Sequence, residues 1–256
     1  MNDSVLAILA FHKIGEPPGR AQTTPWYIPE ATFRTHLHYL SAHGWEVISV
    51  EGLLKGLSEP ESLPRRAALL TFDDGYKSLL GTASRCLNQF GYPSVAFVST
   101  RFVGKYNEWD KGIEPREAIC TWDELRELER RGCSIQSHGV GHRSFENLAP
   151  QEQEEELRQS KSIIEAELGK PVEVFAYPYG EVKSGRSTLN ELLKRIGYRA
   201  ACLCDGKVNR PPWDNDYSLA RVTMFPDSDI PSLLSSRWLF ARSLRQHFGK
   251  SWLKWQ

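Results

Sequence analysis

Short apolar runs alternate with amphipathic stretches along most of this chain, and this alternation predicts a parallel α/β fold. The first run, Val5–Phe11, contains no polar residue and ends at His12, and a second run covers residues 67–72 and is followed by Gly75. Further strands are expected at residues 45–50, 94–99, 133–136, 173–176 and 218–224. Apolar runs of this length, bounded by polar residues or glycine, are typical of core strands whose carboxyl ends open into loops.

Helices are expected between these runs. Pro29 at a first helical turn opens an amphipathic stretch that ends at Gly44. Further helices are expected at residues 50–57, 76–90, 121–131 and 150–169, and the third of these begins with a capping box of Thr121 and Glu124. The acidic opening of the last one, formed by Glu152, Glu154, Glu155 and Glu156, complements the helix dipole and is interpreted as a solvated face.

Length and composition fit one domain. The 256 residues with 40% hydrophobic content can bury a sizeable core, so we expect one barrel-sized catalytic domain over residues 1–256, with residues 230–256 as a helical C-terminal extension. The 32 basic and 32 acidic residues balance, so no nucleic-acid partner is expected. An odd number of cysteines, five, argues against a closed disulfide framework and favours a reducing compartment.

The N-terminal residues favour a cytoplasmic location. Asp3 stands where a signal peptide would need positive charge, and Val5–Phe11 is too short to span a bilayer, so no transmembrane segment is expected there. At the other end, tryptophans alternate with arginines and lysines from Ile230 onward. We interpret this end as a helix packed on the barrel, and the second interpretation is weak contact with a membrane surface.

Candidate chemistry lies where the apolar runs end. Asp73 and Asp74 follow the run at 67–72, and two ionised carboxylates side by side repel each other unless a cation lies beside them. His138 and His142 are the tightly spaced pair among seven histidines. One carboxylate and two imidazoles, with a fourth position open to water, form the pattern of a catalytic zinc site. From the residues alone, a helix cap for the aspartates and a helix face for the histidines stay open.

Three motifs together resemble a known family. The segments TFDDGY (71–76), SHGVGH (137–142) and FAYPYG (175–180) are similar, in order and interval, to the central motifs of the polysaccharide deacetylases, the NodB-homology enzymes of carbohydrate esterase family 4. This resemblance implies a metal-dependent N-deacetylase on a distorted (β/α) barrel. It implies Asp73 as the base and Asp74, His138 and His142 as ligands of one divalent metal ion. Zinc is preferred over cobalt, manganese or iron for its affinity for imidazole and carboxylate.

The N-terminal segment LAFHKI (9–14) resembles a circularly permuted form of this family, found in deacetylases of poly-N-acetylglucosamine. In that form the resemblance implies that His12 protonates the departing amine. A structural histidine at a strand end is the alternative. In the YPYG segment, Pro178 and Gly180 favour a tight turn, and we expect Tyr177 and Tyr179 to line a pocket. The resemblance also implies that a backbone amide after Pro178, which we assign to Tyr179, binds the oxyanion.

The sequence departs from the family pattern at Ala176, where the family has an arginine that orients the catalytic aspartate. We expect Arg221 to replace it and take Arg210 as the second choice. Trp213 and Asp214 lie in the general region of a later Asp–Trp motif. The loop at 101–120 is long for a connector and carries Tyr106, Trp109 and Asp110, which we interpret as a substrate wall, with a self-packed loop as the alternative.

The function expected from these features is hydrolysis of the N-acetyl group of an amino sugar in a glycan, glycolipid or sugar precursor, with release of acetate. A cytoplasmic location would suit a small or lipid-linked sugar better than a finished polymer. Two alternatives remain: hydrolysis of a non-sugar C–N amide or an O-acetyl ester on the same fold, and a carbohydrate-binding protein without catalysis. The presence of Asp73, Asp74, His12 and both motif histidines argues against the last, since a binder needs no such set.

Overall fold

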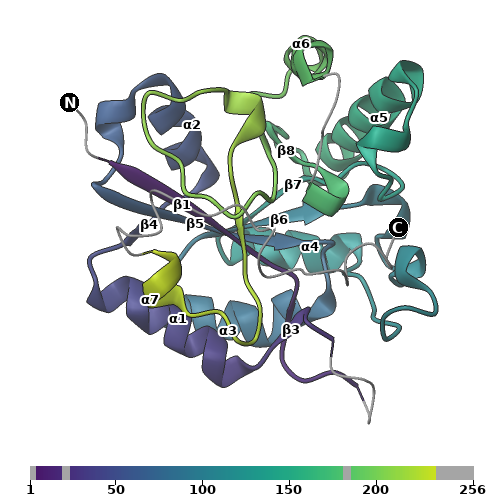
Figure 1. The fold of residues 1–256 in the computed structure, drawn as a ribbon. Coiled ribbons are helices and arrows are strands. Elements are labelled where there is room, and N and C mark those ends of the chain that lie inside the picture. Colours follow the sequence, from purple (N-terminus) through teal and green to yellow (C-terminus); the bar gives the residue numbers. More distant parts are fainter. Residues whose placement is uncertain (1–3, 19–23, 181–185, 235–256) are drawn as a thin grey trace, which may run out of the picture.

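A curled parallel sheet forms the centre of the molecule, which a computed structural model describes for residues 4–18, 24–180 and 186–234 (Figure 1). Its strands follow the order β10-β1-β5-β6-β7-β8-β9, and β4 pairs with β5. The strands are β1 (Val5–Phe11), β4 (Glu46–Val47), β5 (Arg66–Asp73), β6 (Ser94–Val98), β7 (Cys133–Ser137), β8 (Val174–Ala176), β9 (Ala200–Cys202) and β10 (Val222–Thr223). A small second sheet pairs β2 (Lys13–Ile14) with β3 (Tyr27–Ile28). The predicted parallel α/β architecture is confirmed.

Helices connect the strands and cover the sheet (Figure 1). The α-helices are α1 (Glu30–Ala42), α2 (Val50–Ser58), α3 (Ser84–Phe90), α4 (Trp122–Arg130), α5 (Pro150–Leu168), α6 (Arg186–Ile196) and α7 (Ile230–Leu233). Short 3₁₀ turns are η1 (Pro60–Ser62), η3 (Thr100–Phe102), η4 (Glu108–Asp110), η5 (Phe145–Asn147), η6 (Pro178–Gly180) and η7 (Asp216–Ser218), and a π-helical turn, η2 (Leu79–Ala83), precedes α3. The capping box of Thr121 and Glu124 is confirmed, and the helix expected at 76–90 runs from Lys77 through η2 and α3 to Phe90.

Two hydrophobic clusters explain why the first run contains no polar residue. Val5, Ala7, Leu9 and Phe11 belong to a cluster with apolar residues of α1. Leu6 and Ile8 belong to a second cluster, which includes apolar residues of α2. Successive side chains of a strand point to opposite faces, so β1 is buried on both faces, as is usual in a parallel sheet.

The strand register brings the candidate residues to one edge of the sheet. Phe11 pairs with Phe72, so His12 and Asp73 leave the sheet side by side. Val98 pairs with Ser137, the residue before His138. Since all these strands are parallel, their carboxyl ends open on the same side. The topology therefore gathers the predicted chemistry from segments that are distant in sequence.

The segment that leads into β10 contacts strands at both ends of the sheet. Leu219 accepts a backbone hydrogen bond from Leu203 at 2.8 Å and donates one to Ala201 at 2.9 Å, next to β9. Val222 and Thr223 then pair with β1. Arg221 lies between these two contacts and is completely buried. The strand expected at residues 218–224 is thus reduced to β10 and a bridge at Leu219.

The predicted C-terminal extension is covered only in part. Helix α7 ends at Leu233, and residues 235–256 lie outside the described part of the chain, together with the suggested membrane contact. Among the described residues, no helix combines the length and the apolar character needed to cross a bilayer.

Candidate metal and catalytic site

Three side chains from two loops meet at the carboxyl edge of the sheet. Oδ1 of Asp74, after β5, lies 3.1 Å from Nε2 of His142 and 3.6 Å from Nε2 of His138. One ligand atom of each residue lies within 4.8 Å of the others, and all three side chains are buried. The sequence prediction had these three residues as metal ligands, and the structure brings them together.

The donor set fits a divalent cation. Nδ1 of His138 lies 2.7 Å from the carbonyl oxygen of Ala176, which can only accept, so Nδ1 carries the proton and the lone pair of Nε2 faces Asp74. Oδ1 of Asp74 is buried and has no hydrogen-bond partner among the described residues. Burial lowers the pKa of His138 to about 4, so a proton on Nε2 is disfavoured. Two acceptors facing each other in a dry site repel, and a cation between them removes this repulsion.

Backbone strain is concentrated at this site. Among the described residues other than glycine, a positive φ occurs at Asp74 (71°), His142 (50°) and Tyr179 (64°). A left-handed conformation costs a side-chain-bearing residue about 1–2 kcal/mol. Such strain persists where the surrounding structure imposes it, and it is typical of functional sites.

Asp73, beside the metal-ligand candidates, is paired with a buried arginine. Nη1 and Nη2 of Arg221 donate to the two carboxylate oxygens of Asp73 at 2.7 and 2.9 Å. Burial by itself would raise the pKa of Asp73, but the guanidinium and the nearby imidazoles outweigh burial and lower it. Asp73 is therefore ionised. Arg221 comes from the segment before β10, whereas the family arginine would stand at position 176 on β8.

The second choice for the missing arginine, and the two residues in the region of the expected Asp–Trp motif, do not take the place of Arg221. Arg210 is exposed. Trp213 donates from Nε1 to the carbonyl of Gly56 in α2 at 3.1 Å, and Asp214 is exposed. Trp213 is thus hydrogen-bonded to α2, whereas the partner of Asp73 is Arg221.

His12 leaves β1 at the same edge. Its ring lies 4.5 Å from that of Trp26, and its Nδ1 is buried without a hydrogen-bond partner among the described residues. Burial lowers the pKa of His12, and the charges of Asp73 and Asp74 oppose that effect only in part. The imidazole is thus close enough to both aspartates for their charges to affect its pKa. Its Nδ1 has no hydrogen bond within the described part of the chain.

The turn after β8 differs in part from the expectation. Tyr179 is 49% exposed, and its ring lies edge-on to His142 at 4.9 Å. Tyr177 is buried in the core, edge-on to Phe145 and Phe175, so its side chain does not line a pocket. Pro178 is buried in η6. Tyr179 therefore contacts the site through the His142 ring.

The long loop between β6 and α4 reaches the site through Trp109. The indole stacks on the His142 ring at 4.5 Å with an interplanar angle of 22°. Next to it, burial and the charge of Asp74 raise the pKa of Asp110 to about 6. Tyr106 is exposed and lies against Arg116 instead. Of the three residues predicted to form a wall, Trp109 contacts the site directly and Asp110 lies close enough for its charge to interact with Asp74 and His142.

A buried ion pair that the sequence analysis missed attaches this loop to β2, in the small second sheet. Nζ of Lys13 lies 3.0 Å from Oε2 of Glu114, and both side chains are almost fully buried. Tyr27 and Tyr76 face the ammonium group at 4.7 and 4.8 Å. Lys13 follows His12 directly in an otherwise apolar segment, and this position was a signal for a buried lysine. The sequence around Glu114, about a hundred residues away, contains no pattern that identifies it as the partner.

Comparison with known proteins identifies the family. The sequence profile of the polysaccharide deacetylases matches residues 61–201, more than half of the chain. The chain belongs to the polysaccharide deacetylase family. The matched range includes all three motifs that carry Asp73, Asp74, both histidines and Pro178. The predicted enzyme class, a metal-dependent carbohydrate N-deacetylase, is thereby confirmed.

Individual relatives agree with this assignment. YxkH of Bacillus subtilis strain 168, a protein named for the polysaccharide deacetylases, is 23% identical over 222 residues, which cover 86% of this chain and 72% of YxkH. The poly-β-1,6-N-acetyl-D-glucosamine N-deacetylase of Escherichia coli K12 is 26% identical over 203 residues, but the match covers 66% of this chain and only 29% of that protein. The structure of IcaB from Ammonifex degensii is 25% identical with a TM-score of 0.74, covering 88% of this chain and 94% of that one. The curled half-barrel of the NodB type is the fold that this chain shares with IcaB.

Proposed function

We propose that this protein hydrolyses the N-acetyl group of an amino sugar within a glycan, glycolipid or sugar precursor, and releases acetate and a free amine. The observation that carries the proposal is the convergence of Asp74, His138 and His142 beside an aspartate held ionised by Arg221. A dry site with three metal-ligating atoms and an adjacent base is the arrangement that metal-assisted amide hydrolysis requires.

Asp74, His138 and His142 would hold the divalent ion, for which zinc is our first choice. When bound, such an ion lowers the pKa of a coordinated water and polarises the acetamide carbonyl. Asp73 accepts a proton from the attacking water, and Arg221 keeps both carboxylate oxygens oriented during that step. The backbone amide of Tyr179 would donate to the oxyanion as it forms.

His12 would supply the proton that the departing amine needs. Because an amine is a poor leaving group, C–N cleavage depends on a proton donor at the nitrogen, and His12 stands across the register from Asp73. The half-buried His12 ring is held in position against the ring of Trp26.

Aromatic side chains support a sugar as the substrate. Trp26, Trp109 and Tyr179 lie against the histidines of the site and leave it flanked by flat apolar surfaces. Such surfaces pack well on sugar rings. The named substrate of the E. coli relative, a polymer of N-acetylglucosamine, favours an N-acetylhexosamine. A cytoplasmic location remains our proposal, and it would favour short, nucleotide-linked or lipid-linked sugars.

Acetate release from a substrate panel tests this proposal. The metal-reconstituted protein should release acetate from N-acetylhexosamines presented free, nucleotide-linked or as oligomers, and the most active member of the panel identifies the substrate class. O-acetyl sugars serve as the matched comparison. Release from the esters alone would contradict the N-deacetylase assignment and favour the ester hydrolase alternative.

Replacing His12 with Gln should affect amide and activated ester substrates differently. Loss of the proton donor is expected to lower kcat for an N-acetyl sugar by about 10²–10⁴-fold. An aryl acetate has a leaving group that needs no proton, so its hydrolysis should fall less than about tenfold by the same reasoning. Steady-state kinetics on both substrates measures the difference. Equal losses on both would assign His12 a structural rather than an acid role.

A further inference from the structure

A buried carboxylate outside the catalytic set holds the segment between the two histidines. Glu156 of α5 is 6% exposed. Its Oε2 accepts hydrogen bonds from the backbone amides of Val140 at 2.6 Å and Gly141 at 2.9 Å. The interpretation of the acidic start of this helix as a solvated face is therefore wrong for Glu156, because helical periodicity turns this residue toward the sheet together with Leu157 and Ser160.

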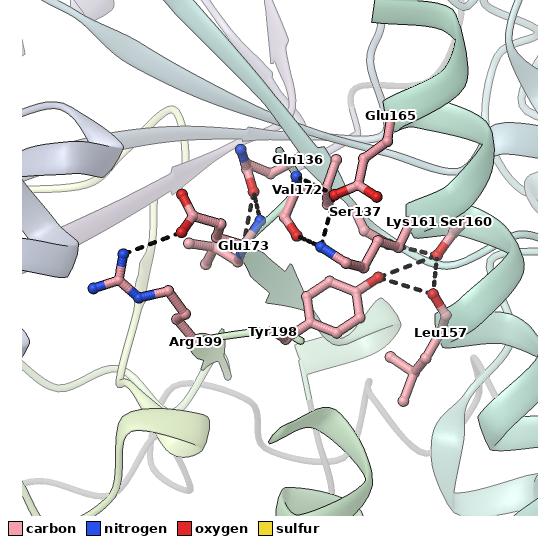
Figure 2. Close-up of polar contacts among 11 residues, drawn as sticks. Gln136, Ser137, Leu157, Ser160, Lys161, Glu165, Val172, Glu173, Tyr198 and Arg199 are labelled. Atoms are coloured by element: carbon pink, nitrogen blue, oxygen red, sulfur yellow. Dashed lines mark hydrogen bonds and ion pairs between the residues drawn. The ribbon is translucent and has the colours of Figure 1, made fainter. Parts of the chain in front are cut away.

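The helix that carries Glu156 is itself fixed to the end of β7. Ser160, one turn further along the same face, lies 2.7 Å from the hydroxyl of Ser137, the residue before His138. Tyr198 donates to the carbonyl of Leu157 at 3.0 Å. Figure 2 shows these groups between α5 and the sheet, with Ser160 and Tyr198 pointing toward each other. Two successive turns of α5 thus contact residues on either side of His138, through the hydroxyl of Ser137 before it and the amides of Val140 and Gly141 after it.

Two glycines allow the close approach of this loop to the carboxylate. Gly139 has a φ of +80°, and a Cβ there would lie 2.9 Å from Oε2 of Glu156. A Cβ on Gly141 would lie 3.1 Å from Oε1. The glycines of the SHGVGH motif therefore serve the contact with Glu156, in addition to shaping the turn.

The loop needs such a restraint because it ends in a strained residue. His142 has a φ of 50°, and its Nδ1 has no hydrogen-bond partner among the described residues, so its ring lacks the backbone acceptor that fixes the His138 ring from the side opposite Asp74. Hydrogen bonds to an ionised acceptor are about twice as strong as neutral ones. An acceptor that binds two consecutive amides also fixes the direction of the chain between the histidines.

We propose that Glu156 is a positioning residue of the metal site, which holds residues 139–141 so that His138 and His142 converge on Asp74 before the ion binds. This inference rests on the proposed metal site. Glu156 does not contact the ion or the substrate. Its contribution is the preformed geometry of two ligands, and loss of that geometry weakens ion binding.

Zinc affinity of three variants tests the inference. Glu156→Gln keeps the shape but removes the charge, Glu156→Ala removes the acceptor, and Glu155→Gln alters the exposed neighbour as a matched control. Loss of groups that orient metal ligands typically weakens affinity by about 10–100-fold, so we expect a Kd about tenfold higher for Gln and about a hundredfold higher for Ala. The zinc Kd of the Glu155→Gln control should stay within about twofold of the wild-type Kd. Competition with a chromogenic chelator measures Kd without any activity assay.

Thermal melting of the metal-free variants separates positioning from plain stability. Unchanged zinc affinity in Glu156→Gln, with or without a lower Tm, would overturn the inference while the proposed function stands. A wild-type protein that binds no zinc would overturn both. If Glu156→Ala does not fold, Gly139→Ala provides the second variant, since it displaces the loop with Glu156 in place and should also raise Kd. Excess zinc should restore acetate release by Glu156→Gln, as a positioning defect requires.

Discussion

Replacing Asp73 with Asn is expected to lower kcat for acetate release by about 10²–10⁴-fold, because an amide cannot accept the proton of the attacking water. The substitution preserves size and one oxygen, so the hydrogen bond from one arm of Arg221 can persist. Metal binding should be almost unchanged, because Asp73 is not among the three converging ligand atoms. Steady-state kinetics at saturating substrate measures the loss.

Zinc affinity and Tm of the same variant provide the control. Asp73 is buried against Arg221, so a loss of activity counts as catalytic only if the variant is folded and binds the ion. A folded, zinc-loaded Asp73→Asn protein with kcat within about tenfold of wild type would contradict the assignment of Asp73 as the base.

Replacing Arg221 with Met should destabilise the fold strongly. The variant leaves the Asp73 carboxylate buried without its counter-charge, and breaking a buried ion pair on one side typically costs about 3–5 kcal/mol. The expected result is a decrease of that size in the free energy of unfolding, measured by urea denaturation. The cost belongs to the orphaned charge rather than to lost packing, since methionine fills most of the same space.

The double variant Asp73→Asn with Arg221→Met separates these causes. Since neither charge remains, much of the stability lost in Arg221→Met should return. Independent sites add to within about 0.5 kcal/mol, whereas this pair should deviate from additivity by considerably more. If the change in the free energy of unfolding of the double variant equals the sum of the two single changes, the ion-pair account is contradicted. Arg221 would then act through packing alone.

The candidate site was predictable because strand ends in a parallel sheet share one edge. Three of the apolar runs lead directly into chemically active residues, so Asp73, Asp74, His12 and His138 could be placed together without coordinates. Arg221 required a different argument. It is 148 residues from Asp73, and no periodicity connects the two. Its position in the strand-like segment at 218–224 makes it the arginine that can replace the one absent at position 176.

Several features had a sequence signal that was not used. Phe175 and Tyr177 are two residues apart at the end of a strand, and the period of two places both rings in the same core cluster. Glu156 and Ser160 share a face with Ile164 on α5, so the helical period that buries the isoleucine also buries the glutamate. The ion pair of Lys13 with Glu114 is different, because only the folded loop brings these groups together.

The most direct test of the metal-dependent deacetylase is acetate release during a zinc titration of chelator-treated protein, with the best N-acetylated sugar of the panel as substrate. The account predicts no release without metal and full release at one equivalent of ion, and no recovery in an Asp74→Asn variant at the same zinc concentration. Acetate release that persists after complete metal removal, or that Asp74→Asn retains, would contradict it.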